Sequence, residues 1–121
     1  MESELKLTAE CFQWFHNNYS EQRGLLVRVK NELDNHPYKT STDRMKQLAE
    51  NKATGIISGA SDFYLVLQNS VIFVELKVGT GTQSEKQKQW ELLVQQYGHR
   101  YVVIYSLEKF KELIWNHFGK K

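Results

Sequence analysis

The sequence has few of the residues that mark disulfide-bonded, zinc-binding or membrane-spanning proteins. Its one cysteine, Cys11, excludes an internal disulfide and any cysteine-based zinc site, and its apolar neighbours predict a buried thiol. No apolar run approaches the roughly 18 residues that a membrane span needs, so we expect no membrane partner. Residues 1–4 show no basic segment followed by an apolar core. We therefore expect no signal peptide and a cytoplasmic location.

The sequence also has little net charge and a single proline. Sixteen Lys and Arg residues against fourteen Asp and Glu give a net charge of +2. A protein that coats nucleic acid by charge alone is usually more basic, so a phosphate backbone would have to be held by local patches or a metal ion. The one proline, Pro37, leaves most of the chain free for regular elements. The length of 121 residues predicts a single domain over residues 1–121.

Hydrophobic periodicity predicts helices and strands in alternating order. We expect helices over 8–19, from a cap at Thr42 to about 52, from Ser84 to 97, and over 107–118. We expect strands over 25–30, 62–67, 71–78 and 100–105. This order predicts an α/β sandwich with a central mixed β-sheet flanked by helices. The apolar face of the third helix is expected to consist of Trp90, Leu93, Val94 and Tyr97.

The strands over 62–67 and 71–78 are close enough in sequence to form a hairpin. A turn at residues 68–69 sets Asp62 opposite Glu75, whereas a turn at 69–70 sets Asp62 opposite Lys77. Because strand side chains alternate with period two, both registers place these three side chains on one face. The other face is expected to be core and carries Phe63, Leu65, Leu67, Ile72, Val74, Leu76 and Val78.

Two carboxylates on opposed strand positions, with Cβ atoms roughly 5 Å apart, repel each other unless a cation lies between them. Oxygen ligands from Asp62 and Glu75 suit a hard ion such as Mg²⁺ or Mn²⁺, and the backbone carbonyl of Leu76 is a further candidate ligand. Lys77 brings an ammonium group within reach of a water or a phosphate oxygen. The alternative to a metal site is that these charged residues are solvated side chains at the ends of strands.

Several motifs occur in a fixed order along the chain: Gly59-Ala60-Ser61-Asp62, then 71–77 ending in Glu-Leu-Lys, then the Ser-x-x-Gln-x-x-Trp helix motif at 84–90. In this combination the chain resembles the VRR-NUC group of the PD-(D/E)XK nuclease superfamily, over about residues 8–118. The pattern is similar to the small stand-alone nucleases of phages and prophages. The resemblance implies a restriction-endonuclease-like sandwich. The family usually has proline before the aspartate, where this chain has Ser61.

The resemblance also implies roles for individual residues. Asp62 and Glu75 become metal ligands, Lys77 the catalytic lysine, Gln87 a further active-site residue, and Glu10 an acidic residue directed at the metal site. From spacing alone, Ser84 and Gln87 form a capping box, which is compatible with the active-site role. A helix-surface glutamate such as Glu10 is, from sequence alone, a solvated residue.

We therefore expect a hydrolase acting on ester bonds, namely a nuclease dependent on Mg²⁺ or Mn²⁺ that cleaves phosphodiester bonds in DNA. Branched or junction DNA is the expected structure-specific substrate, and a homodimer is expected because one small chain presents limited surface to a duplex. Lys39, Arg44 and Lys46 are candidate nucleic-acid-binding residues. The alternatives are a catalytically silent nucleic-acid-binding module with a nuclease fold, and a protein–protein adaptor.

Overall fold

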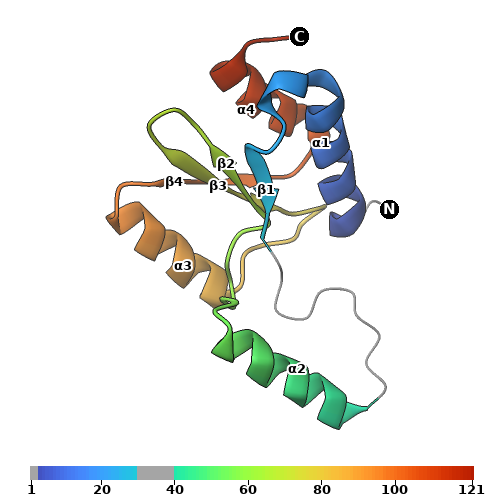
Figure 1. The fold of residues 1–121 in the computed structure, drawn as a ribbon, viewed down its shortest axis with the longest axis vertical. Helices are drawn as coiled ribbons and strands as arrows, with labels where there is room; N and C mark the ends of the chain where they lie inside the picture. Colours follow the sequence, from blue (N-terminus) through green and yellow to red (C-terminus); the bar gives the residue numbers. More distant parts are fainter. Residues whose placement is uncertain (1–2, 30–39) are drawn as a thin grey trace.

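The structure is a computed structural model that describes residues 3–29 and 40–121. It contains four α-helices, one 3-10 turn (η1, Ser20–Gln22) and four strands within these residues (Figure 1). The helices are α1 (Glu4–Asn18), α2 (Ser41–Ala53), α3 (Glu85–Gln96) and α4 (Leu107–Phe118). The strands are β1 (Leu26–Arg28), β2 (Phe63–Val66), β3 (Val71–Leu76) and β4 (Arg100–Ile104).

The four strands form one mixed sheet in the order β1-β2-β3-β4. β2 runs antiparallel to β1 and β3, and β4 runs parallel to β3. In the β2–β3 hairpin Phe63 pairs with Val74, and the N–H of Leu67 donates to the carbonyl of Ser70 over 2.8 Å. The turn therefore occupies residues 68–69. Of the two registers that the sequence allows, the structure thus has the one that sets Asp62 opposite the position of Glu75.

Helices cover both faces of the sheet, and the predicted α/β sandwich is confirmed (Figure 1). On one face, α1 and α4 pack on the apolar side chains of β2 and β3, and this contact forms the hydrophobic core. Cys11 of α1 is fully buried in that core, as predicted. The fully buried members are Leu7, Cys11, Phe15, Tyr19, Phe63, Leu65, Ile72, Val74, Leu76, Phe110 and Ile114.

The opposite face is covered by α3 through one aromatic side chain. The Trp90 ring makes edge contacts with Phe73, at a centroid distance of 4.8 Å, and with Tyr101, at 6.1 Å. The predicted inward positions of Leu93 and Tyr97 are wrong, because these side chains are 51% and 77% exposed. Trp90 is the aromatic contact of α3 with the sheet, and Leu93 and Tyr97, one and two turns further along, are exposed.

Two helix starts differ from prediction because other residues cap them. α1 begins at Glu4 rather than at residue 8, since Ser3 Oγ accepts the N–H of Lys6 over 3.0 Å. α2 is capped by Thr40 rather than Thr42, since Thr40 Oγ1 accepts the N–H of Asp43 over 3.0 Å. The predicted cap of α3 and both ends of α4 agree with the structure.

Helix α2 lies apart from the sheet and the other three helices (Figure 1). It follows the segment 30–39, of which nothing is described, and leads through residues 54–61 to β2. None of the helices in the described residues is long and apolar enough to cross a membrane.

Candidate active site

Asp62 lies immediately before β2, where the ladder between β2 and β3 ends. Its Oδ2 accepts the backbone N–H of Leu76 over 2.7 Å, and its backbone carbonyl accepts the N–H of Val29 over 2.8 Å. The carboxylate thus takes the place of a backbone acceptor beside β3. These two bonds hold Asp62 between the ends of β1 and β3.

The residue before the aspartate is a fully buried serine. Ser61 Oγ donates to the carbonyl of Phe63 over 2.9 Å, so its hydroxyl is satisfied inside the protein. This bond spans the entry into β2. Ser61 therefore orders the backbone at the entry into β2.

Glu75 lies on the α3 side of β3 and is only 2% exposed. Its Oε2 accepts a hydrogen bond from Gln87 Nε2 over 2.9 Å and lies 3.4 Å from Lys77 Nζ. Its Oε1 is buried and, among the residues that the structure describes, has no hydrogen-bond partner. One oxygen of this carboxylate is therefore held by two donors, and the other receives none. In its protonated form the Glu75 carboxyl also hydrogen-bonds to the Asp62 carboxylate.

The two carboxyl groups perturb each other. Burial, and then the negative charge of Asp62, raise the pKa of Glu75 to about 8, although the Lys77 ammonium opposes this shift. Burial also raises the pKa of Asp62, against the N–H of Leu76 and the charges of Lys77 and Arg28. Two buried acids with raised pKa values are the expected result when two carboxylates share one site without a cation.

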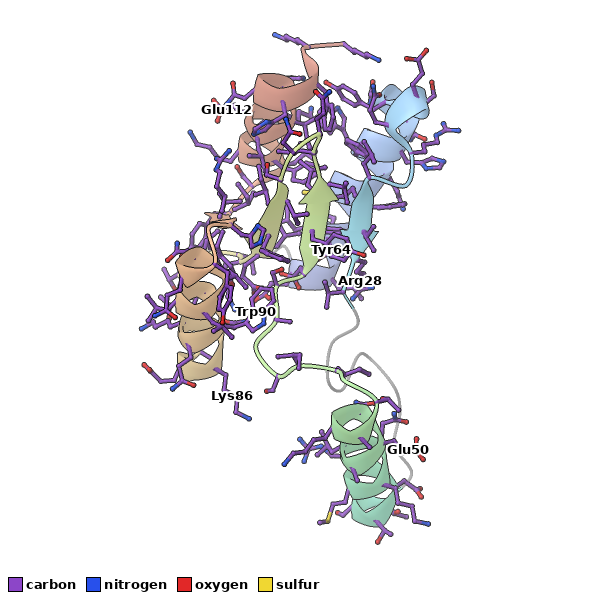
Figure 2. All side chains as sticks on the ribbon, turned by 60° about the vertical axis from the view of Figure 1, so that its left-hand side comes forward. Arg28, Glu50, Tyr64, Lys86, Trp90 and Glu112 are labelled. Carbon is purple, nitrogen blue, oxygen red and sulfur yellow. The ribbon has the colours of Figure 1, made fainter. Side chains whose placement is uncertain are left out.

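Gln87 connects this acidic pair to the start of α3. Its Oε1 accepts the backbone N–H of Ser84 over 2.9 Å, and Ser84 Oγ accepts the backbone N–H of Gln87 over 3.2 Å. The predicted capping box is thus confirmed, and the amide nitrogen that the cap leaves free binds Glu75. Figure 2 shows Trp90, on the same helix, extending toward the sheet.

The backbone of Leu76 faces the same region. The N–H and C=O groups of one strand residue point to the same neighbouring strand. Because the N–H of Leu76 is bonded to the Asp62 carboxylate, its carbonyl lies on the side of Asp62 as well. The predicted backbone ligand is therefore directed toward the β2 side of the pair.

This donor set fits a hard divalent cation. The free oxygen of Glu75, the second oxygen of Asp62 and the Leu76 carbonyl are all oxygen donors, which Mg²⁺ and Mn²⁺ prefer. Within residues 3–29 and 40–121, no group of three or more His, Cys, Asp and Glu side chains is placed to hold a metal. Two carboxylates with water and substrate phosphate as the remaining ligands is a common arrangement for Mg²⁺.

The other predicted site residues lie elsewhere. Glu10 is paired with Lys6 on its own helix, at 3.9 Å, and its side chain is 36% exposed. Arg44 and Lys46 are exposed on α2, which lies away from the sheet (Figure 1). Lys39 is outside the described residues. The structure thus brings together Asp62, Glu75, Lys77 and Gln87. Glu10 lies on α1, and Arg44 and Lys46 lie on α2.

Sequence reasoning missed two neighbours of the site. Tyr101 pairs with Phe73 on the α3 side of the sheet, and burial raises the pKa of its hydroxyl. Period-two alternation along β4 could have identified it. Gly59 lies against the first turn of α3, where an added Cβ would meet the backbone carbon of Lys86 at 2.6 Å. No sequence signal predicts that contact, because it depends on how two distant segments pack.

Comparison with known proteins supports the architecture. No family model matches the sequence, and no curated protein matches it. Among solved structures, the chain is similar to a VRR-NUC domain protein, with a TM-score of 0.72 and 15% sequence identity. The likeness covers 98% of this chain and 89% of the other. The chain therefore has the VRR-NUC fold, a restriction-endonuclease-like arrangement of helices around a mixed sheet.

Proposed function

We propose that the protein is a nuclease that hydrolyses phosphodiester bonds in DNA and depends on a divalent cation, Mg²⁺ or Mn²⁺. The observation that carries this proposal is the buried Glu75, whose Oε2 is held by Gln87 and Lys77 while its Oε1 stays without a partner beside Asp62. The fold shared with a VRR-NUC domain protein supports it.

Asp62, Glu75 and the Leu76 carbonyl would hold the cation. When bound, a divalent cation lowers the pKa of a water and offsets the negative charge that develops on the phosphate. The two carboxylates need that positive charge, since burial and mutual repulsion raise both of their pKa values. With a cation bound, Asp62 and Glu75 would be the two negative charges of this group, and Lys77 its positive side chain.

Lys77 and Gln87 position the reacting groups. The Lys77 ammonium lies 3.4 Å from Glu75 and is almost fully buried, so it can donate to an attacking water or to a phosphate oxygen at the edge of the carboxylate pair. Gln87 fixes the orientation of the Glu75 carboxylate through one hydrogen bond. A donor aimed at the charge that develops on the phosphate, the role proposed for Lys77, contributes about 3 kcal/mol in the transition state.

The experiment is cleavage of labelled single-stranded, duplex and branched DNA with Mg²⁺ or Mn²⁺, with EDTA as the blank. Glu75→Gln and Lys77→Met are expected to lose activity by about 100-fold or more. Glu112→Gln and Lys109→Met are matched controls, because this exposed pair lies on α4. A wild-type protein that is inert on every substrate, or active variants at positions 75 and 77, would contradict the proposal.

A catalytically silent nucleic-acid-binding module is the second candidate. Among the described residues, the site has two carboxylates and no group of three or more ligating side chains. A protein that binds nucleic acid without cleaving it does not require a third ligating side chain. DNA binding that persists in EDTA, with no cleavage under any metal, would favour this candidate.

We further propose that branched DNA is the preferred substrate and that the protein acts as a homodimer, as in a phage or prophage nuclease. Two copies would present two sites to two strands and double the contact surface. A substrate panel of flaps, junctions and ends tests the first point. A monomeric mass by light scattering at high concentration would contradict the second.

A further inference from the structure

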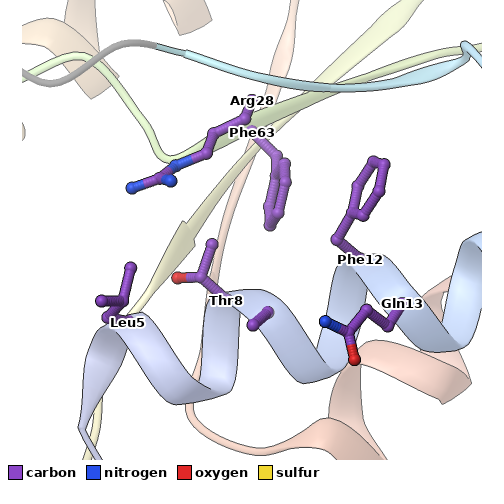
Figure 3. Close-up of a pocket in the computed structure, with 7 residues that line it drawn as sticks. Leu5, Thr8, Phe12, Gln13, Arg28 and Phe63 are labelled. Carbon is purple, nitrogen blue, oxygen red and sulfur yellow. The ribbon is translucent and has the colours of Figure 1, made fainter.

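A concave pocket lies on the α1 side of the sheet, between α1 and the ends of β1 and β2 (Figure 3). Its volume is about 330 Å³, at the lower end of the range for pockets that hold small organic groups. Leu5, Thr8, Ala9, Phe12 and Gln13 of α1 line one side of it, and Arg28 of β1 lies across it. The fully buried Phe63 of β2 lies beneath these residues. None of these residues is a proposed metal ligand, and none is Lys77 or Gln87.

The wall of this pocket is apolar and open to solvent. Leu5 is 49% exposed and Phe12 is 40% exposed, which is unusual for large apolar side chains that line one concavity. The ring of Phe12 is nearly parallel to that of Phe63, at 14° with centroids 6.5 Å apart. An aromatic ring that entered the pocket would remove apolar surface from water and contact an aromatic wall.

Arg28 adds a positive charge at the rim. It pairs with Phe63 across β1 and β2, so both side chains lie on the α1 side of the sheet. Figure 3 shows its guanidinium extending over the pocket toward Leu5. A guanidinium matches the geometry of a phosphate group. The pocket thus joins an aromatic wall with a phosphate-binding side chain, which are the two features that recognise a nucleotide of a single strand.

The pocket is next to the proposed nuclease site. Phe63 follows Asp62 in the chain, and the charge of Arg28 acts on the Asp62 carboxylate. Strand alternation directs Asp62 and Phe63 to opposite faces, but Asp62 stands at the end of the sheet, before β2 begins. Asp62 and the pocket therefore adjoin the same end of β2.

We propose that this pocket is a subsite for the base of an unpaired DNA nucleotide, with Arg28 on the adjoining phosphate. The subsite rests on the proposed nuclease function and specifies its substrate class. A base in a duplex is paired and stacked, so only a single-stranded, frayed or flipped base can enter. The enzyme is then selective for DNA with unpaired nucleotides beside the scissile bond, such as flaps and open ends.

The experiment measures binding with Ca²⁺ in place of Mg²⁺, using fluorescent single-stranded oligonucleotides whose integrity is checked afterwards. An abasic site is moved along the oligonucleotide one position at a time. Ala9→Phe fills the pocket from an exposed wall position, and Asn17→Phe is its control because it places the same phenylalanine side chain at another exposed position of α1. Thermal melting of both variants verifies that they fold.

The subsite predicts that one abasic position weakens wild-type binding by about 5-fold to about 100-fold. Ala9→Phe is expected to bind as weakly as this and to be insensitive to the abasic site, whereas Asn17→Phe behaves as wild type. A second measurement uses the unchanged protein: an oligonucleotide with 5-iodouracil at the sensitive position should photo-crosslink to Phe12. This readout does not depend on any variant folding.

The outcomes separate the subsite from the nuclease. A flat abasic scan, wild-type binding by Ala9→Phe and crosslinks outside the pocket would overturn the subsite, even if the wild-type protein cleaves DNA. The same flat scan results if the pocket takes an aromatic side chain of a protein partner. Abasic-sensitive binding without cleavage under any metal would support the subsite and contradict the nuclease. Absence of both binding and cleavage would overturn both.

Discussion

Gln87 donates a hydrogen bond from its side-chain amide to Glu75 over 2.9 Å, while the oxygen of the same amide closes the cap of α3. One side chain thus joins the first turn of a helix to the acidic residue of a neighbouring strand. The orientation of Glu75 depends on where α3 begins. Changes at the start of this helix are therefore expected to act on the carboxylate pair.

The two roles of Gln87 can be separated by mutation. Gln87→Ala removes both the cap oxygen and the donor to Glu75, so we expect cleavage to fall by about 10-fold to about 100-fold. Ser84→Ala removes only the other half of the cap. It should lower the free energy of unfolding by about 1 kcal/mol and leave cleavage within about twofold of wild type.

Urea unfolding and cleavage rates, measured on both variants, test this separation. A Ser84→Ala protein that loses as much activity as Gln87→Ala would show that Gln87 acts only through the helix cap.

Gly59 packs too closely on α3 to accept a side chain. A Cβ there would meet Lys86 at 2.6 and 2.7 Å and the backbone nitrogen of Gln87 at 2.9 Å, and the residue has a φ of +88°. Gly59→Ala is expected to cost about 3 kcal/mol, from left-handed strain and the clash together. Because the clash displaces the turn that carries Gln87, cleavage should also fall.

Gly55→Ala is the matched control, since its φ is +92° but nothing lies within 4 Å of an added Cβ. It should show only the conformational cost, about 1 to 2 kcal/mol, with unchanged cleavage. Chemical denaturation of the two variants measures the difference. Equal losses at both glycines would mean that the approach to α3 is not tight in solution.

The raised pKa of Glu75 makes the stability of the metal-free protein dependent on pH. Its pKa is about 8 in the folded state against 4.5 for an unperturbed glutamate, because burial and Asp62 disfavour its charge. Between these values the folded protein retains a proton that the unfolded chain releases. The free energy of unfolding is therefore expected to fall as pH rises from about 4.5 to about 8, and to level off above that.

Urea titrations in EDTA at a series of pH values measure this slope. Glu75→Gln should flatten most of it, whereas Glu108→Gln, an exposed change on α4, should keep it. Mn²⁺ should stabilise the wild-type protein more at high pH than at low pH, since binding competes with the proton. If the free energy of unfolding varied with pH in the same way for wild type and Glu75→Gln, burial and the charge of Asp62 would not raise the pKa of Glu75 as described.

Local patterns in the sequence predicted much of this arrangement. Period-two alternation placed Glu75 and Lys77 on one face, and the Ser84–Gln87 spacing predicted the capping box that the structure contains. The hairpin register was limited to two choices, and the structure has one of them. These features follow from spacing within one or two elements, which is why sequence alone suffices for them.

Features that depend on distant packing were not predicted. The N–H of Leu76 donates to the Asp62 carboxylate rather than to a backbone carbonyl, because the pairing of β2 with β3 ends before Ser61. Hydrophobic periodicity does not predict where this pairing ends. Tyr97 is exposed although it continues the stripe of Trp90, because helical spacing says nothing about where the sheet ends. The pocket between α1 and Arg28 likewise arises only when the elements assemble.

The central claim is that Asp62 and Glu75 bind one divalent cation. Anomalous diffraction from crystals grown with Mn²⁺ tests it most directly, because the signal locates the metal without any assumption about activity. We expect one strong peak within coordination distance of Glu75 Oε1 and the second oxygen of Asp62. Crystals with Mn²⁺ bound elsewhere and none between these two carboxylates would contradict it.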